Sequence, residues 1–163
     1  MSMLVTYHAL SPTEAERVQQ LDPDAMDDWL DRRDGACSID LDKAWHGLHF
    51  TLTGSAWDTS GSLGDLILGG DEFGEDLGYG PPRWLAAERV ATLSAELDDL
   101  SVADFAQRID FTQLEAQAIY PPIWGRADEQ ADLTNLLVDA YGQIREEFRR
   151  AASAGDGFVV VML

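Results

Sequence analysis

The sequence is poor in positive charge. Its 163 residues include 11 lysines and arginines against 30 aspartates and glutamates, which gives a formal net charge of -19 at pH 7. Binding to a nucleic-acid backbone or to an anionic membrane surface depends on lysine and arginine, so this composition argues against both. We expect no direct nucleic-acid binding and no membrane partner. A basic protein is the kind of macromolecular partner that the charge favours.

Cysteine and long apolar runs are also scarce. Cys37 is the only cysteine, which excludes a disulfide within the chain and suits a reducing compartment. No apolar window approaches the length of a membrane span, and the first ten residues lack the basic and apolar regions of a signal peptide. We therefore expect a soluble, cytoplasmic protein.

The composition is otherwise that of a globular protein. Hydrophobic residues make up 45% and charged residues 25% of the chain, and the length suits one domain with its own core. No linker and no repeat divides the sequence, so we expect a single domain over residues 1–163.

Local patterns predict strands at both ends of the chain with helices between them. Residues 3–9 predict a first strand, and residues 158–163, with three consecutive valines, predict a strand buried on both faces. Ser11, Pro12 and Glu14 form a start signal for a helix over residues 12–21. Further helices are expected after Asp22, over residues 41–52, 62–68 and 86–97, after Ser101, and over residues 111–119 and 128–152, with a brief strand at 83–85.

This order of elements predicts an α/β fold. Helices that lie between two buried strands must cover both sides of a sheet to shield it from water. We therefore expect a single-domain, three-layer α/β/α sandwich. Its mixed sheet would include the N- and C-terminal strands.

The predicted helix over residues 41–52 presents a row of polar side chains. Asp42, His46, His49 and Thr53 follow one another at steps of four, three and four residues. Such a row could offer three ligands to zinc. We favour a simpler interpretation, in which Asp42 caps the helix start, His49 lies at the edge of the core and His46 is solvated. No metal and no cofactor is therefore expected.

Three other features also allow both a chemical and a structural interpretation. Lys43 could be a desolvated nucleophile or the partner of one of many carboxylates. Residues 78–83 (GYGPPR) lack the Lys-Ser/Thr pair of a P-loop, so we interpret them as a tight turn whose Arg83 clamps a carboxylate. The acidic residues 71–76 lack EF-hand spacing and indicate a solvated loop.

Aromatic residues stand beside most of the loop signals. They are Trp45, Trp57, Tyr79, Trp84, Tyr120 and Trp124. Rings with a polar tip can line a recess or fix a loop corner, and the sequence leaves both open. If these loops meet in space, His49, Tyr79, Arg83 and Tyr120 would surround one pocket.

Three segments together resemble the YfbM-like family, small bacterial proteins classed as a domain of unknown function. They are residues 41–54 (LDKAWHGLHFTLTG), 78–83 (GYGPPR) and 119–124 (IYPPIW). In the first segment the residues that match the family pattern are Asp42, Lys43, Trp45, Leu48, His49 and Gly54, whereas His46 is not part of it. The resemblance spans most of the chain and implies a compact three-layer α/β fold, with no established activity.

Two functions of different classes agree with these observations. The favoured one is a non-enzymatic binding or regulatory domain whose acidic surface meets a basic protein. The alternative is a small enzyme acting on an anionic small molecule, with His49 as general acid or base, Arg83 as anion clamp, and Tyr120 or Asp42 orienting the histidine. The candidate pocket residues are Asp42, Lys43, Trp45, His49, Tyr79, Arg83, Tyr120 and Trp124, none assigned as catalytic. Acidity that serves solubility alone is the third possibility.

Overall fold

The computed structural model, which describes residues 2–33 and 35–163, contains an open antiparallel sheet of five strands. These are β1 (Val5–Leu10), β2 (Ile39–Asp42), β3 (Asp71–Glu72), β4 (Arg83–Leu85) and β5 (Gly157–Met162), in the order β2-β1-β5-β4-β3. Every neighbouring pair is antiparallel. The α/β class and the place of both terminal strands are confirmed, whereas the mixed sheet is wrong. A strand buried on both faces is typical of parallel sheets, but a central antiparallel strand with helices on both sides is buried just as fully.

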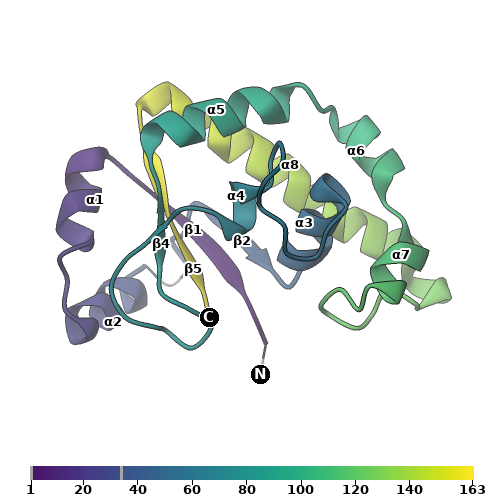
Figure 1. Ribbon diagram of the computed structural model, residues 1–163, viewed down its shortest axis with the longest axis horizontal. Coiled ribbons are helices and arrows are strands. Elements are labelled where there is room, and N and C mark those ends of the chain that lie inside the picture. Colours follow the sequence, from purple (N-terminus) through teal and green to yellow (C-terminus); the bar gives the residue numbers. More distant parts are fainter. Residues whose placement is uncertain (1, 34) are drawn as a thin grey trace.

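The helices cover the two faces of the sheet unequally (Figure 1). Two short ones, α1 (Pro12–Val18) and α2 (Pro23–Asp31), lie on one side. The others in the described residues are α3 (Trp45–Thr53), α4 (Asp65–Leu68), α5 (Ala87–Asp98), α6 (Val102–Arg108), α7 (Phe111–Ala116) and α8 (Gln130–Ala154), with a 3-10 turn at Ala127–Glu129. The predicted sandwich of three full layers is therefore not reproduced. Across residues 2–33 and 35–163, every helix is too short or too polar to cross a lipid bilayer.

Strand β5 divides the hydrophobic core into two parts. Phe158 and Val160 belong to the large cluster beneath α3, α5 and α8, whereas Val159 and Val161 belong to a small cluster beneath α1 and α2. Successive side chains of a strand point to opposite faces of the sheet, so alternate residues of β5 pack into different clusters. Burial on both sides explains why the C-terminal run of valines carries no polar residue.

Local start signals for the helices are confirmed where side chains cap backbone groups. The Ser11 hydroxyl accepts a hydrogen bond from the Glu14 N–H at 3.2 Å, and the Glu14 carboxylate accepts one from the Ser11 N–H at 2.9 Å. Asp22 caps α2 and Ser101 caps α6 in the same manner. Each cap satisfies a backbone donor that the first helical turn leaves without a partner.

The predicted helix over residues 41–52 is wrong in its first turn. Residues Ile39–Asp42 form β2, alternate between buried and exposed, and pair with β1. Asp42 has a φ of 45°, and α3 begins only at Trp45. Asp42 therefore neither caps this helix nor shares a face with His46 and His49. The alternation Ile-Asp-Leu-Asp was the signal for a strand. It was concealed by four apolar residues that also follow one another at steps of four, three and four, namely Leu41, Trp45, Leu48 and Leu52.

Helix α3 lies so close to its neighbours that one position has no room for a side chain. A methyl group on Gly47 would stand 2.7 Å from ring atoms of Trp124 and 3.1 Å from Leu137. Trp124 cannot move aside easily, because it is fully buried and its indole N–H donates to the Ile119 carbonyl at 2.8 Å. Glycine at position 47 therefore sets the approach of α3 to Trp124 and α8.

We expect Gly47→Ala and Gly142→Ala to change stability in opposite directions. Gly47→Ala overpacks the Trp124 contact and should lower the free energy of unfolding by about 1–2 kcal/mol. Gly142 lies within α8 with nothing within 4 Å of an added methyl group. Its replacement by alanine should raise the free energy of unfolding by about 0.5–1 kcal/mol. Urea unfolding followed by tryptophan fluorescence measures both changes. Equal unfolding midpoints for Gly47→Ala and the wild type would show that the Gly47 site has room for a methyl group.

Candidate functional site

An aromatic cluster surrounds the start of α3. The Trp45 ring stacks on His46 at a centroid distance of 4.6 Å, Trp57 lies 4.5 Å from His46, and Tyr120 lies 6.3 Å from Trp45. The Met3 backbone joins two of these rings, because its N–H donates to the Tyr120 hydroxyl and its carbonyl accepts from the Trp45 indole. The structure therefore brings together two of the candidate residues, Trp45 and Tyr120, where they anchor the chain just before β1.

His46 lies at the centre of this cluster, and its predicted solvation is wrong. It is 2% exposed, its Nδ1 lies 3.1 Å from the Tyr120 N–H and its Nε2 lies 3.0 Å from the Ala56 carbonyl. The backbone N–H can only donate and the carbonyl can only accept, so the ring must carry its proton on Nε2. Burial lowers the pKa of His46, which agrees with this neutral form. His46 thus ties two loops to α3, a role that the family pattern did not suggest.

His49 lies one turn further along α3, sealed inside the molecule. Its side chain is 0% exposed, and within the described residues neither ring nitrogen has a partner at full hydrogen-bond geometry, although the Asp58 backbone lies near the ring. Burial, with a smaller effect of nearby His46, lowers the pKa of His49 to about 4, although the neighbouring Asp58 opposes the shift. The ring is therefore neutral near pH 7. In this conformation it does not reach solvent, where a substrate would have to approach it.

Arg83 lies in β4 and Tyr79 in the loop before it. The hydrogen-bond partner of Arg83 is not the one that the sequence suggested. The Arg83 side chain is 9% exposed and donates to the Gly69 carbonyl at 3.1 Å, while the Tyr7 hydroxyl donates to the Leu66 carbonyl at 2.8 Å. Both bonds hold the C-terminal end of α4, where a positive charge is favourable. No carboxylate of the described residues lies within 4.0 Å of Arg83, so the expected carboxylate clamp is wrong. Tyr79 is half-buried in the loop before Arg83.

The remaining candidate residues divide between surface and core. Asp42 and Lys43 are exposed, whereas Trp124 is fully buried against Gly47. Among the described residues no group of three metal-ligating side chains lies close enough to hold a metal ion. The structure does not join His49, Tyr79, Arg83 and Tyr120 through hydrogen bonds or ring contacts in the part of the chain that it describes.

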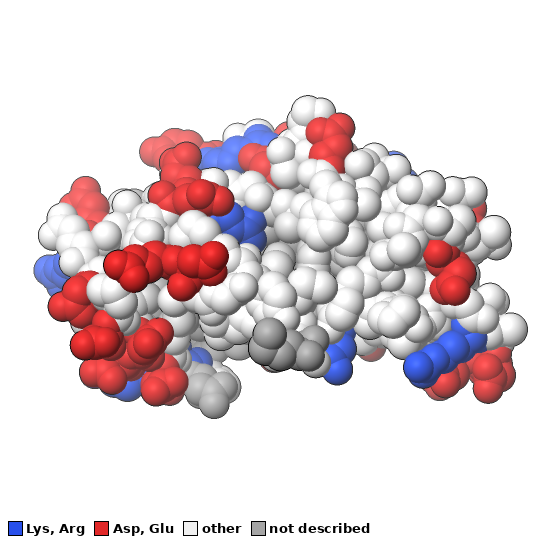
Figure 2. All heavy atoms as spheres, turned by 60° about the horizontal axis from the view of Figure 1, so that its bottom comes forward, with Lys and Arg blue, Asp and Glu red and all other residues white. Residues whose placement is uncertain are grey.

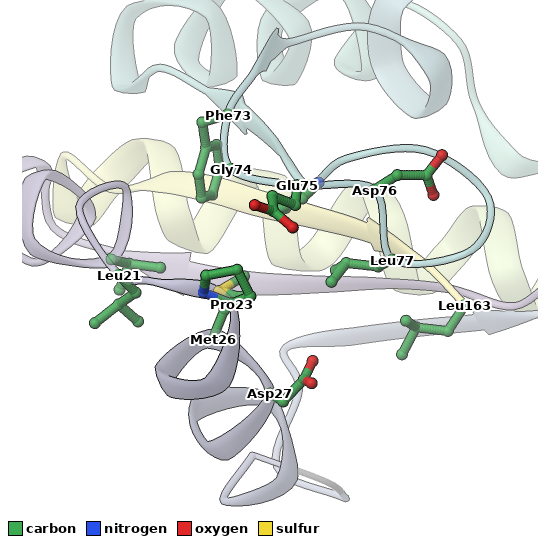
Figure 3. A pocket seen from close by; sticks show the side chains of 12 residues that line it. Leu21, Pro23, Met26, Asp27, Phe73, Gly74, Glu75, Asp76, Leu77 and Leu163 are labelled. Carbon is green, nitrogen blue, oxygen red and sulfur yellow. The ribbon is translucent and has the colours of Figure 1, made fainter.

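A cleft of about 560 Å³ opens instead on the α1–α2 side of the sheet (Figure 3). One wall comes from the α1–α2 connection with Leu21 and Met26, and the other from the loop after β3 with Phe73 and Leu77. These side chains pack against the small core cluster that Val159 and Val161 join. The volume lies within the range of ligand pockets. Apolar side chains and polar groups contribute to the lining in equal measure.

Carboxylates stand at the rim of this cleft. Asp27 belongs to the α2 wall, and Glu75 extends from the opposite loop into the gap between the walls (Figure 3). Both are exposed, and neither forms an ion pair with the described residues. Asp76 has a different role, because its carboxylate accepts the N–H groups of Gly78 and Gly80 and so lowers its own pKa. Asp76 therefore shapes the loop, while Asp27 and Glu75 remain available to a ligand.

The cleft lies within a strongly acidic surface. Figure 2 shows acidic side chains gathered at the end of the molecule that carries α1 and α2. Residues 11–31 contain seven carboxylates and residues 71–76 contain four, all of them exposed, and Arg17 is the only basic residue in these two segments. We call this surface the acidic face. The sequence displayed the charges, but nothing in it showed that the two segments meet across a cleft.

The tight turn predicted for residues 78–83 is present on one wall of the cleft. Gly78 and Gly80 have φ values of 120° and 104°, which glycine adopts far more readily than other residues. The Leu77 N–H donates to the Gly80 carbonyl at 3.1 Å, and the Phe73 N–H donates to the Pro82 carbonyl at 3.0 Å. Residues 78–83 thus form the predicted tight turn, which holds Phe73 and Leu77 over the cleft.

The buried His49 should make stability depend on pH. Its pKa is about 4 in the folded chain against 6.5 when unfolded, so the unfolded chain binds the proton first as pH falls. The stabilising contribution is complete above pH 6.5 and is lost as pH falls towards 4. Between pH 7 and about pH 5.5 we expect wild type to lose about 1 kcal/mol more unfolding free energy than His49→Leu. Urea unfolding at both pH values measures the difference, and parallel losses would contradict the assignment.

The fold of this chain is shared with a protein from Escherichia coli. The crystal structure described as that of a protein of unknown function, YfbM, has a TM-score of 0.73, and the match covers 98% of this chain and 99% of that chain. The sequences are 17% identical, so this likeness shows the fold alone. No curated protein matches the sequence.

A family pattern extends over nearly all of the sequence. The family described as "Domain of unknown function (DUF1877)" matches residues 1–161. This match, together with the YfbM-like fold, confirms the resemblance that three short segments indicated. The chain therefore belongs to the DUF1877 family of domains of unknown function.

Proposed function

We propose that this chain is a non-enzymatic binding domain whose cleft docks a segment of a basic protein. The segment would place an apolar side chain between the two walls and its lysine or arginine side chains beside Asp27 and Glu75. The observation that carries this proposal is the cleft with apolar side chains and a carboxylate on each wall. The apolar side chains favour an apolar group of the ligand, and the carboxylates favour its cationic groups.

The apolar half supplies affinity. Leu21, Phe73 and Leu77 are partly exposed in the absence of a ligand, so covering them removes apolar surface from water. Filling such a recess with one leucine-sized side chain is worth about 1.5–3 kcal/mol. The recess rests on the small core cluster, so its floor does not need to be ordered when a ligand binds.

The charged half supplies attraction and selectivity. Asp27 and Glu75 have no cationic partner among the described residues, and the surrounding acidic face adds a field of the same sign. A field of this kind accelerates the approach of a cationic partner and repels an anionic one, and salt weakens both effects. An anionic ligand would meet repulsion from every side of the cleft.

The alternative, a small enzyme with a histidine, arginine and tyrosine pocket, has less support. His49 is fully buried in this conformation, and Arg83 donates to a backbone carbonyl at the end of α4. An enzyme acting on anions would also need a cationic surface at its entrance, whereas the surface near the cleft is acidic. A His49→Ala protein with unchanged ligand binding and an unchanged cellular phenotype would count against this alternative.

Synthetic peptides test the proposed binding. The probe is a labelled ten-residue peptide of alternating lysine and leucine, compared with a lysine–serine peptide and a glutamate–leucine peptide of equal length. We expect fluorescence anisotropy to show the tightest binding for the lysine–leucine peptide, because only this peptide matches both halves of the cleft. Binding should weaken as salt rises. Equal binding of all three peptides would contradict the proposal, and solubility would then be the remaining role of the acidic face.

Charge reversal at the rim should weaken that binding. In Asp27→Lys/Glu75→Lys both walls repel the peptide, and we expect its Kd to rise about tenfold or more, or ~1.4 kcal/mol. The matched control is Asp132→Lys/Asp139→Lys, which changes the net charge equally at two exposed positions of α8 without an ion pair. An equal loss in both variants would show that only the total charge matters and that the cleft is not the docking site.

A further inference from the structure

A second, smaller cavity lies on the same side of the sheet, beyond the end of α2. It has a volume of about 240 Å³, and its polar lining comes from β1, from Asp31 at the end of α2, from the segment after α2 and from β2. The residues that matter here are Thr6 and His8 of β1, Arg33 and Cys37 of the connecting segment, and Asp40 of β2. A thiol, an imidazole and a guanidinium group thus share one small space.

His8 is a buried base in the wall of this cavity. It is 3% exposed, its Nε2 lies 3.2 Å from the Thr6 hydroxyl, and its Nδ1 has no hydrogen-bond partner among residues 2–33 and 35–163. The Trp29 ring meets it edge-on at a centroid distance of 5.2 Å. Burial and the nearby Arg33 charge lower the pKa of His8 to about 4, so the ring is neutral near pH 7. A buried nitrogen without a partner is costly unless it serves a ligand or a reaction.

Arg33 adds a positive charge at the same place. Its guanidinium group lies 4.6 Å above the Trp29 ring, which fixes its position. No carboxylate of residues 2–33 and 35–163 lies within 4.0 Å of it. A cation near a cysteine stabilises the thiolate, the reactive form of the side chain, and in this cavity Arg33 acts against the carboxylates of Asp31 and Asp40. Cys37, which is partly exposed, lines the cavity together with this cation.

We propose that this cavity is a thiol oxidation site, where His8 and Arg33 promote the reaction of Cys37 with a small neutral hydroperoxide. The size of the cavity admits a molecule such as hydrogen peroxide together with water. The charge of the protein selects against the main alternative oxidants, because anionic disulfides are repelled by a net charge of -19. Asp40 at the cavity wall adds to this repulsion.

The reaction balances without another reactant. The Cys37 sulfur attacks one oxygen of the hydroperoxide, and the O–O bond breaks as the S–O bond forms. The thiol proton passes by way of the neutral His8 ring to the departing oxygen, which leaves as water or an alcohol. Sulfur is oxidised by two electrons to a sulfenic acid, and the hydroperoxide is reduced. Arg33 stabilises the negative charge that develops on the sulfur before the attack.

The test measures trapped sulfenic acid on the intact chain after treatment with hydrogen peroxide. A 1,3-diketone is used as the trap because the four methionines gain the same oxygen mass but do not react with it. The reference is the same chain unfolded in urea, where Cys37 has no cavity around it. We expect the folded chain to react about tenfold faster or more. A folded rate equal to or below the unfolded one would overturn the proposal.

Variants separate the cavity from the thiol itself. Arg33→Met keeps the stem of the side chain without its charge and should slow the reaction severalfold, as should His8→Asn. The matched control is Arg17→Met, an exposed position of α1 outside this cavity, which should leave the rate unchanged. Cys37→Ser should give no adduct. If His8→Asn does not fold, Arg33→Met alone decides, and an unchanged rate in that variant would overturn the proposal.

Discussion

The structure depends on the burial of β5 from both sides. Phe158 and Val160 require cover on one face of the sheet and Val159 and Val161 on the other, because a strand without polar side chains cannot leave either face in water. In the described residues six helices lie on one side, together with most of the aromatic side chains, among them Trp45, Trp124 and Phe148. In the described residues only two short helices, α1 and α2, remain to cover the other face, and the cleft of about 560 Å³ lies on that side.

The thin layer borders the cleft and the smaller cavity described above. Both cavities lie on the α1–α2 side, and Leu163 lines each of them. On this side the chain also concentrates its carboxylates, which keep α1, α2 and the loop after β3 hydrated above a small apolar cluster. A face with few packed side chains and strong charge is well suited to recognition, because ligands can reach its apolar surface without disturbing the main core.

What the sequence predicted correctly was local. The capping box of Ser11 and Glu14, the cap at Asp22 and the turn at residues 78–83 each depend on neighbours within a few residues, and all are present. Strand direction and the partners of Arg83 depend on residues far along the chain, so local patterns could not supply them. The error at Asp42 arose where a strand period and a helix period overlap, and only pairing with β1 resolves it.

The family resemblance has a physical explanation that bears on function. Trp45 and Tyr120 hold the Met3 backbone, Trp124 fits against Gly47, and Arg83 holds the end of α4. The three segments that resemble the family therefore contain contacts that build the fold. Their histidine, arginine and aromatic residues suggest an active site only when the sequence is read alone. With the exception of Pro82, the residues of the acidic cleft lie outside these segments. Under the proposed function, the α1–α2 side and the loop after β3, rather than these segments, determine what this chain binds.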